Sequence, residues 1–306
     1  MRLHAQGKQR MPKLGLIRWD QASLEPTRRN LSEALQARGY IEKENIVILP
    51  RAADENAARA DEIMREFIAE KVDLVIVGQT PAAHAARRAS QTIPIVLSGV
   101  ADPVATGLVK SLAYPGGNVT GLSLNLPELA AKRVEALRDA LPAVKRIAFL
   151  GSARDPAAKL FLANTQQAAR ILGMQLHVEL IGGESELDAA FARIAQTGAQ
   201  AVIVQPILGP FSKQTVALAL KHRLASISDY ETFPRTGGLL SYGPNRTGNL
   251  ALLAEYVDRI LKGAKPADLP IQEPTRFTLA VNLKTARALG VTIAPLVLDR
   301  ADEVIR

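Results

Sequence analysis

The 306-residue sequence contains no cysteine. This absence excludes disulfide bonds, thiolate catalysis and cysteine-ligated zinc within the chain. Long apolar runs are also missing, since none reaches the roughly 18 residues that a membrane-spanning helix needs. We therefore expect a chain that does not insert into a membrane and does not depend on covalent cross-links for its stability.

Aromatic residues are scarce, with 7 phenylalanines, 5 tyrosines and 1 tryptophan. A sugar-binding cleft lined by several stacking rings is therefore disfavoured. The single tryptophan, Trp19, follows the first predicted strand directly. It is either a stacking surface for a planar ligand or a partly buried packing residue.

Motifs of catalysis are absent as well. The chain has no GxSxG, no Walker lysine motif and no GxGxxG after a strand. Its 4 histidines are scattered without the spacing of metal ligands. We expect no catalytic residue, no metal and no cofactor, and hence a protein that is not an enzyme.

The net charge of the chain says less about its function than these absences do. The formal net charge is +8, from 38 basic and 30 acidic residues spread along the whole chain. No basic patch with interleaved aromatics, zinc-finger spacing or RNP motif is present, so no nucleic-acid partner is expected. The excess charge indicates solvated helix faces or a field that favours small anionic ligands. The basic, polar stretch of residues 1–10 lacks the apolar core of a secretory signal peptide and is set aside for the fold.

Short apolar runs alternate with amphipathic helical patterns along most of the chain. Such βα units are typical of parallel sheets covered by helices on both faces. About ten strands exceed one ordinary sheet, so the pattern predicts an α/β fold of two Rossmann-like lobes. Three crossings between the lobes are predicted near residues 119–125, 237–246 and 268–276. The N-terminal lobe then comprises residues 12–121 and 246–269, and the C-terminal lobe residues 122–245 and 270–306.

Ligands of open α/β sheets bind beyond the carboxyl ends of the strands. In the first lobe these ends carry Trp19, Gln79, Thr80, Pro81, Ser98 and Asp102. The run 79–81 opens a helix, with Pro81 suited to its first position, and its amides and the Thr80 hydroxyl suit a carboxylate; the alternative is an ordinary N-cap. Asp102 either accepts a ligand ammonium or caps a helix expected to begin near Val104.

The second lobe offers its own candidates at its strand ends, and one lies just beyond the first crossing. The ligand-binding residues predicted there are Asn125, Ser152, Gln205, Asp229 and Tyr230. Asp229 competes with Asp102 as the partner of a ligand ammonium. An α-amino acid needs receptors for both its carboxylate and its ammonium group, and a planar side chain gains from stacking.

Several phrases of the chain resemble one protein family. They are 102–109 (DPVATGLV), 115–121 (PGGNVTG), 237–243 (GGLLSYG), 260–270 (ILKGAKPADLP) and the end of the chain from Asn282. Together they are similar to the substrate-binding proteins of ABC transporters with the type-I periplasmic-binding fold, in the subfamily that includes tryptophan- and tyrosine-binding members. This resemblance covers nearly everything from Lys13 onwards.

The resemblance implies a monomeric, periplasmic protein that captures a small-molecule ligand between its lobes by hinge closure and delivers it to an ABC permease and its ATPase. An aromatic or other apolar amino acid is the implied ligand, and a planar aromatic carboxylate is the alternative. A ligand-sensing module of the same fold, feeding a receptor or regulator, is the alternative function.

Overall fold

The chain folds into two compact α/β units, as the alternating pattern predicts. The computed structural model describes residues 10–246 and 248–306. Unit 1 contains the described residues of Met1–Gly99, Leu108–Leu122 and Thr247–Gln272, and unit 2 contains Val100–Gly107, Ser123–Arg246 and Glu273–Arg306. Each unit has its own sheet and its own apolar core, and each is described by itself below.

The strands are β1 (Lys13–Arg18), β2 (Val47–Ala52), β3 (Leu74–Val77), β4 (Ile95–Val100), β5 (Val119–Ser123), β6 (Arg146–Ser152), β7 (Gln175–Ile181), β8 (Ala201–Val204), β9 (Ala225–Ser228), β10 (Leu240–Pro244), β11 (Phe277–Asn282) and β12 (Glu303–Ile305). The α-helices are α1 (Leu24–Gln36), α2 (Ala57–Ala69), α3 (Thr80–Ala89), α4 (Leu126–Ala140), α5 (Ala158–Ile171), α6 (Leu187–Gln196), α7 (Ser212–Lys221), α8 (Asn249–Leu261), α9 (Leu283–Leu289) and α10 (Pro295–Arg300).

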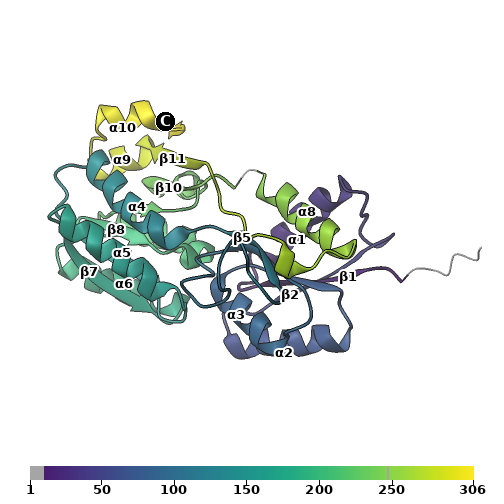
Figure 1. Ribbon diagram of the computed structural model, residues 1–306. Coiled ribbons are helices and arrows are strands. Elements are labelled where there is room, and N and C mark those ends of the chain that lie inside the picture. The colour runs from purple at the N-terminus through teal and green to yellow at the C-terminus, as the bar shows by residue number, and fades with distance from the viewer. Residues whose placement is uncertain (1–9, 247) are drawn as a thin grey trace, which may run out of the picture. The chain divides into compact units, whose positions relative to one another are not determined.

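Unit 1 is built on a five-stranded sheet in the order β2-β1-β3-β4-β5. Side chains alternate between the faces of β1, so Leu14 and Leu16 pack under α1 and α8, while Gly15 faces the Phe67 ring of α2. Figure 1 shows α1 and α8 side by side on one face and α2 and α3 on the other, although α1 and α8 are far apart in the sequence. A hydrogen bond of 2.9 Å from the Tyr40 hydroxyl to Asp258 ties the two segments together.

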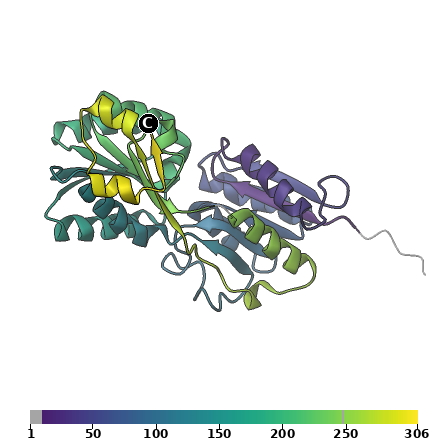
Figure 2. The ribbon, with the colours of Figure 1, turned by 90° about the horizontal axis from the view of Figure 1, so that it is seen from above.

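Unit 2 is built on a seven-stranded sheet in the order β12-β11-β10-β9-β8-β6-β7, with helices on both faces (Figure 2). Ile147 and Phe149 of β6 face α4 and α5, whereas Ala148 and Leu150 face α6 and α7. The centre of the sheet is parallel as predicted, and the pairing of β10 with β11 is antiparallel. This pair lies towards the β12 end of the sheet, outside the run from β7 to β10 in which all printed pairs are parallel.

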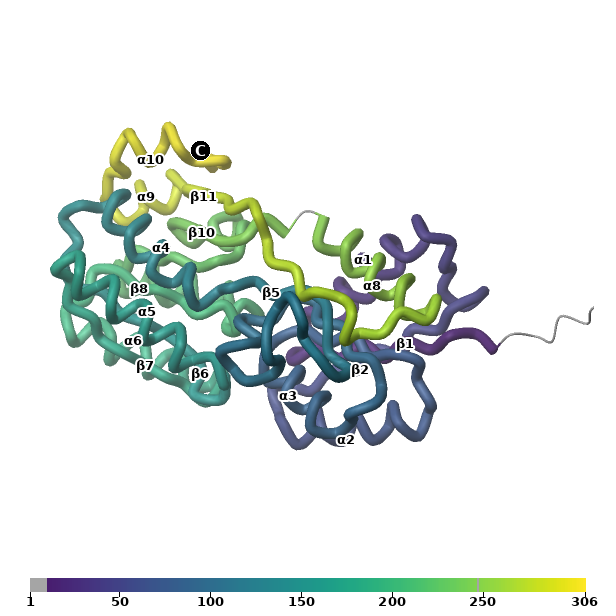
Figure 3. Tube along the Cα trace, in the orientation of Figure 1, coloured from purple at the N-terminus to yellow at the C-terminus, as the bar shows by residue number. Residues whose placement is uncertain are grey.

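The division into units differs from the predicted lobes mainly in one segment, with shifts of up to three residues at the other boundaries. Val100–Gly107 groups with unit 2, although it was expected in the first lobe, so the chain passes between the units at five points and not at three. The Leu124 amide donates to the Val100 carbonyl at 2.8 Å, and the Leu126 amide donates to the Ala101 carbonyl at 3.2 Å. These bonds fasten the segment to the beginning of α4, and Figure 3 traces how β5 leads into that helix.

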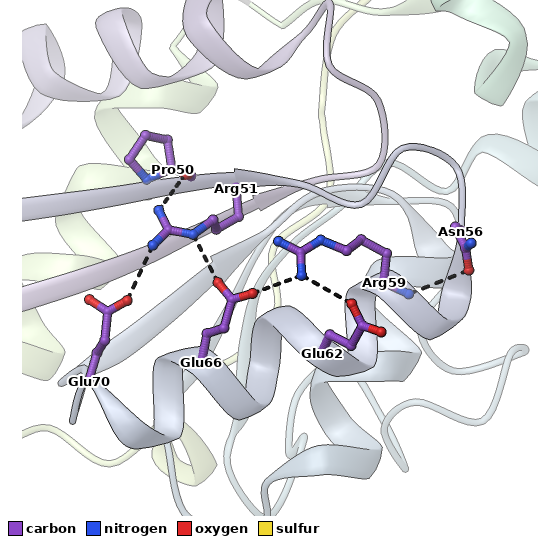
Figure 4. A network of polar contacts seen from close by, with 7 residues as sticks. All are labelled: Pro50, Arg51, Asn56, Arg59, Glu62, Glu66 and Glu70. Carbon is purple, nitrogen blue, oxygen red and sulfur yellow. Dashed lines mark hydrogen bonds and ion pairs between the residues drawn. The ribbon is translucent and has the colours of Figure 1, made fainter.

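A network of ion pairs joins β2 to α2 on the surface of unit 1 (Figure 4). Glu66 accepts from Arg51 at 3.1 Å and from Arg59 at 2.8 Å, and the same arginines reach Glu70 and Glu62. The five side chains are each about a third to a half exposed. Because water screens such pairs, the network contributes little to stability.

We expect Glu66→Ala to lower the free energy of unfolding by less than about 1 kcal/mol, because its ion pairs are solvated. Its neighbour Phe67 is fully buried against β1, so Phe67→Ala should cost about 3–5 kcal/mol. Urea unfolding of both variants measures the contrast. A loss above about 2 kcal/mol in Glu66→Ala would contradict this account of the network.

Candidate functional site

Polar side chains of unit 1 gather where β1, β3 and β4 end. These strands are parallel neighbours, so Trp19, Gln79 and Ser98 lie along the same carboxyl edge of the sheet, which we call the unit 1 edge. Gln79 adopts a left-handed φ of 68° and links two of the loops. Its Oε1 accepts from the Trp19 amide at 3.0 Å, and its Nε2 donates to Asp20 at 3.3 Å. The Gln79 amide group is therefore already engaged in holding the edge together.

Asp20 is a residue of this edge that the sequence reasoning missed. Its side chain is buried, with 4% of the residue exposed, and accepts from the Ser23 amide and hydroxyl, both at 2.7 Å. Ser23 in turn accepts from Arg18 Nε at 3.1 Å. The position of Asp20, directly after Trp19 at the end of a strand, was the signal that could have identified it.

The other predicted residues of the unit 1 edge lie close to this network. Trp19 is 4% exposed and Thr80 is 3% exposed, while Pro81 is buried in the first turn of α3 as expected. Gln79 is the N-cap residue of α3 and makes no side-chain capping bond. Within the described residues, the buried Ser98 hydroxyl has no hydrogen-bond partner. It lies beside Gly78, where a Cβ atom would collide with the Arg18 guanidinium.

Unit 2 has a corresponding edge, where β6, β8, β9 and β10 end in parallel, which we call the unit 2 edge. Gln205 follows β8, and its Oε1 accepts from the Ser152 amide at 2.8 Å at the end of β6. Its Nε2 donates to Asp155 at 2.7 Å, and Asp155 also accepts from the Ala157 amide at 3.0 Å. Gln205 therefore joins two strand ends in unit 2, much as Gln79 does in unit 1.

Asp155 is the titratable member of this network. Burial raises the pKa of its carboxyl group to about 6, and the hydrogen bond from the Ala157 amide opposes the rise. Each carboxylate oxygen of Asp155 accepts a hydrogen bond from a neutral donor, the Ala157 amide or the Gln205 side chain. The carboxyl group therefore does not need a cation as a partner. The sequence reasoning missed Asp155, whose position before a helix resembles an ordinary capping residue.

The predicted pair Asp229 and Tyr230 lies after β9 and already has a partner within unit 2. Asp229 forms an ion pair of 2.6 Å with Arg246, whose guanidinium carbon lies 4.3 Å from the centre of the Tyr230 ring. Burial pulls the pKa of Arg246 down, but Tyr230 and Asp229 outweigh it and raise the pKa above its usual value. Gly243 lets β10 lie against the Asp229 backbone, since a Cβ atom at position 243 would collide with it.

Arg133 of α4 brings a second guanidinium to the unit 2 edge. Its residue is 1% exposed, and its Nε donates to the Tyr242 carbonyl of β10 at 3.1 Å. Burial lowers the pKa of Arg133 to about 10, with Asp229 opposing this effect and Arg246 adding to it. No sequence signal identified Arg133 or Arg246, because arginines in a helix and after a glycine-rich run are ordinarily surface residues.

Asp102 and Asn125 serve local structure in unit 2. Asp102 Oδ1 accepts from the Val104 amide at 3.0 Å and the Ala105 amide at 2.9 Å, so it caps a turn. The helix expected from Val104 is absent, since residues 103–107 form turns. Asn125 is the N-cap residue of α4 and donates to Glu128 at 2.8 Å. Direct ligand contact by either residue stays a prediction.

The described residues contain neither a metal-binding cluster nor a membrane-spanning helix. No group of three or more histidine, cysteine, aspartate or glutamate side chains in the described part of the chain could hold a metal ion. None of the helices within residues 10–246 and 248–306 is long and apolar enough to cross a membrane.

Comparison with known proteins identifies the chain. The two α/β units have the fold of type-I periplasmic binding proteins. The model of the family "ABC transporter substrate binding protein" matches residues 19–305, so the chain belongs to that family. Its role is to bind a solute for an ABC transporter, and the family match does not favour the alternative of a sensing module. Substrate-binding proteins of this family act outside the cytoplasm.

Three relatives are similar over most of their length. The tyrosine-binding protein of Clostridioides difficile is 27% identical over 272 residues, which are 88% of this chain and 78% of that protein. A conserved domain protein of Vibrio cholerae has a TM-score of 0.89 at 28% identity, covering 96% of this chain and all of that one. An ABC domain of Streptococcus pneumoniae in complex with L-Trp has a TM-score of 0.87 at 25% identity, covering 96% and 99%.

Proposed function

We propose that this protein captures an aromatic or other apolar amino acid, or a related planar aromatic carboxylate, for import by an ABC transporter. The observation that carries the proposal is the pair of polar networks at the carboxyl edges of the two sheets. Each includes an aromatic residue, Trp19 in unit 1 through its backbone amide and Tyr230 in unit 2 through its ring. Ligands of open α/β folds bind at such edges. The similarity to a tyrosine-binding protein and to a protein solved with L-Trp supports the same ligand class.

The proposal includes the setting in which the protein works. It acts as a periplasmic monomer that delivers its ligand to a permease and an ATPase, and it has no enzymatic activity of its own. The residues proposed to contact the ligand include Thr80, Ser98 and Tyr230. Closure of the two units on the ligand, expected from the resemblance, remains a prediction.

A ligand screen tests the function. Because Trp19 is the sole tryptophan, selective excitation of its fluorescence reports on the unit 1 edge. We expect L-tyrosine, or another member of a panel of aromatic acids and apolar amino acids, to change this emission. The same compound should stabilise the fold by about 2.7 kcal/mol at a hundredfold excess over its Kd, since it binds only the native state.

The control for the screen is Trp19→Phe, which abolishes the fluorescence signal but should still be stabilised by the same compound. Neutral sugars and basic amino acids serve as unrelated solutes. If a sugar stabilises the protein and none of the aromatic or apolar compounds does, the proposed ligand class is wrong.

A further inference from the structure

Two arginine side chains bond to groups near the ends of β9 and β10, and both have donors without acceptors. Arg246 holds Asp229 with one Nη atom and lies over the Tyr230 ring. Arg133 uses its Nε for the Tyr242 carbonyl. Within the described residues, Arg246 Nε and Arg133 Nη2 are buried and have no hydrogen-bond partner. Native proteins rarely leave such atoms unpaired, so the two donors indicate a missing acceptor.

The charges at this place do not balance. Asp229 is the carboxylate that pairs with Arg246, and among the described residues no other carboxylate contacts either guanidinium. The positive charge of Arg246 lowers the pKa of Arg133, and Asp229 and Tyr242 are the other ionisable groups that act on Arg133. The guanidinium groups of Arg133 and Arg246 therefore carry two positive charges near the single negative charge of Asp229, in a region largely removed from water.

We propose that Arg246 receives a carboxylate group of the ligand and that Arg133 is a positioning residue that keeps positive charge behind it. The inference rests on the proposed function and specifies which group of the ligand the unit 2 edge recognises. A guanidinium suits this task because its planar donors match both oxygens of a carboxylate. Arg246 is the contact residue because 30% of its side chain is exposed, whereas Arg133 is enclosed.

The same geometry weighs against an ammonium receptor at Asp229. Its side chain has no exposed surface and is occupied by Arg246 at 2.6 Å. A ligand ammonium would have to displace that guanidinium and would then lie near two like charges. Recognition at the unit 2 edge therefore selects the acid end of the ligand.

The test compares acids with their uncharged amides by calorimetry. The probes are L-tryptophan against L-tryptophanamide and benzoate against benzamide. We expect the wild-type protein to prefer the acid of the pair that it binds by at least about 30-fold. Arg246→Met should lower the affinity for that acid by about 30- to 1,000-fold, leave the amide nearly unchanged, and so abolish the preference. Arg246→Lys should keep part of it.

Two further variants keep the test decisive. Arg235→Met removes a guanidinium of unit 2 that pairs with Glu303 at the surface, and it should retain the full preference for the acid. Asp229→Asn removes the competing carboxylate, so it should bind the acid at least as tightly as the wild type does. If Arg246→Met does not fold, Arg246→Lys and Asp229→Asn decide the question.

The outcomes separate this inference from the proposed function. If the wild-type protein binds acid and amide equally, or if folded Arg246→Met keeps the wild-type preference, the carboxylate receptor is wrong while the solute-binding function stands. If the protein binds neither acids nor amides and instead binds an unrelated solute, both are wrong.

Discussion

Replacement of Arg133 by methionine is expected to stabilise the protein while it weakens discrimination between acid and amide ligands. Arg133 is 1% exposed, and burial lowers the pKa of its guanidinium to about 10. Holding that charge in the core costs about 3 kcal/mol, judged from the shift of the pKa. Loss of the bond to the Tyr242 carbonyl costs about 1 kcal/mol in return. The net gain should be about 1–3 kcal/mol.

Two measurements check this expectation. Urea unfolding gives the stability, and calorimetry with L-tryptophan and L-tryptophanamide, or with benzoate and benzamide, gives the discrimination. Arg138→Met is the matched control, since Arg138 is on the same helix, is 43% exposed and pairs with Asp139. The control should change neither quantity by much.

A purely structural role for Arg133 would give a different result. The variant would then lose stability and keep the full preference for the acid. If Arg133 is retained for binding, Arg133→Met should raise stability and lower the discrimination between acid and amide. Functional sites often hold charges that the fold alone would not favour.

The positions of the edge residues were predictable because parallel strands end in register. In unit 1, Gln79 follows β3 and Ser98 lies near the end of its neighbour β4, and in unit 2, Ser152 ends β6 and Gln205 follows its neighbour β8. Short apolar runs followed by polar residues carry this information in the sequence itself. The sequence pattern does not show that Gln79 bonds to Asp20 or that Gln205 bonds to Asp155. Each of these bonds joins residues that follow different strands of the sheet.

The errors have a common physical cause. The segment 100–107 carries helix-like residues but is held by bonds to the start of α4, some twenty residues away, and forms turns. Asp229 was predicted as a partner for a ligand ammonium, which stays untested, and the sequence did not indicate its ion pair with Arg246 from beyond the next strand. Such tertiary contacts override local pattern, and sequence periodicity does not report them.

The stability of unit 2 should fall as the pH rises from about 4 to about 7, because of Asp155. Burial raises the pKa of this carboxyl group to about 6 in the folded protein, whereas an ordinary aspartate titrates near 3.8. Between these values the native state keeps a proton that the unfolded chain has released. Stability is therefore highest below about pH 4 and is lost as the pH passes through 6, by about 3 kcal/mol in all.

Urea unfolding at several pH values measures the effect in the wild type and in Asp155→Asn, which cannot ionise. The variant changes the hydrogen bond with Gln205 and so shifts the whole curve, but only the difference in slope matters. The stability of the variant relative to the wild type should rise by about 3 kcal/mol across this range. Asp139→Asn, at a site where 38% of the side chain is exposed, is the control. Parallel curves for the wild type and Asp155→Asn would show that Asp155 ionises normally, and that water reaches this part of the unit 2 edge.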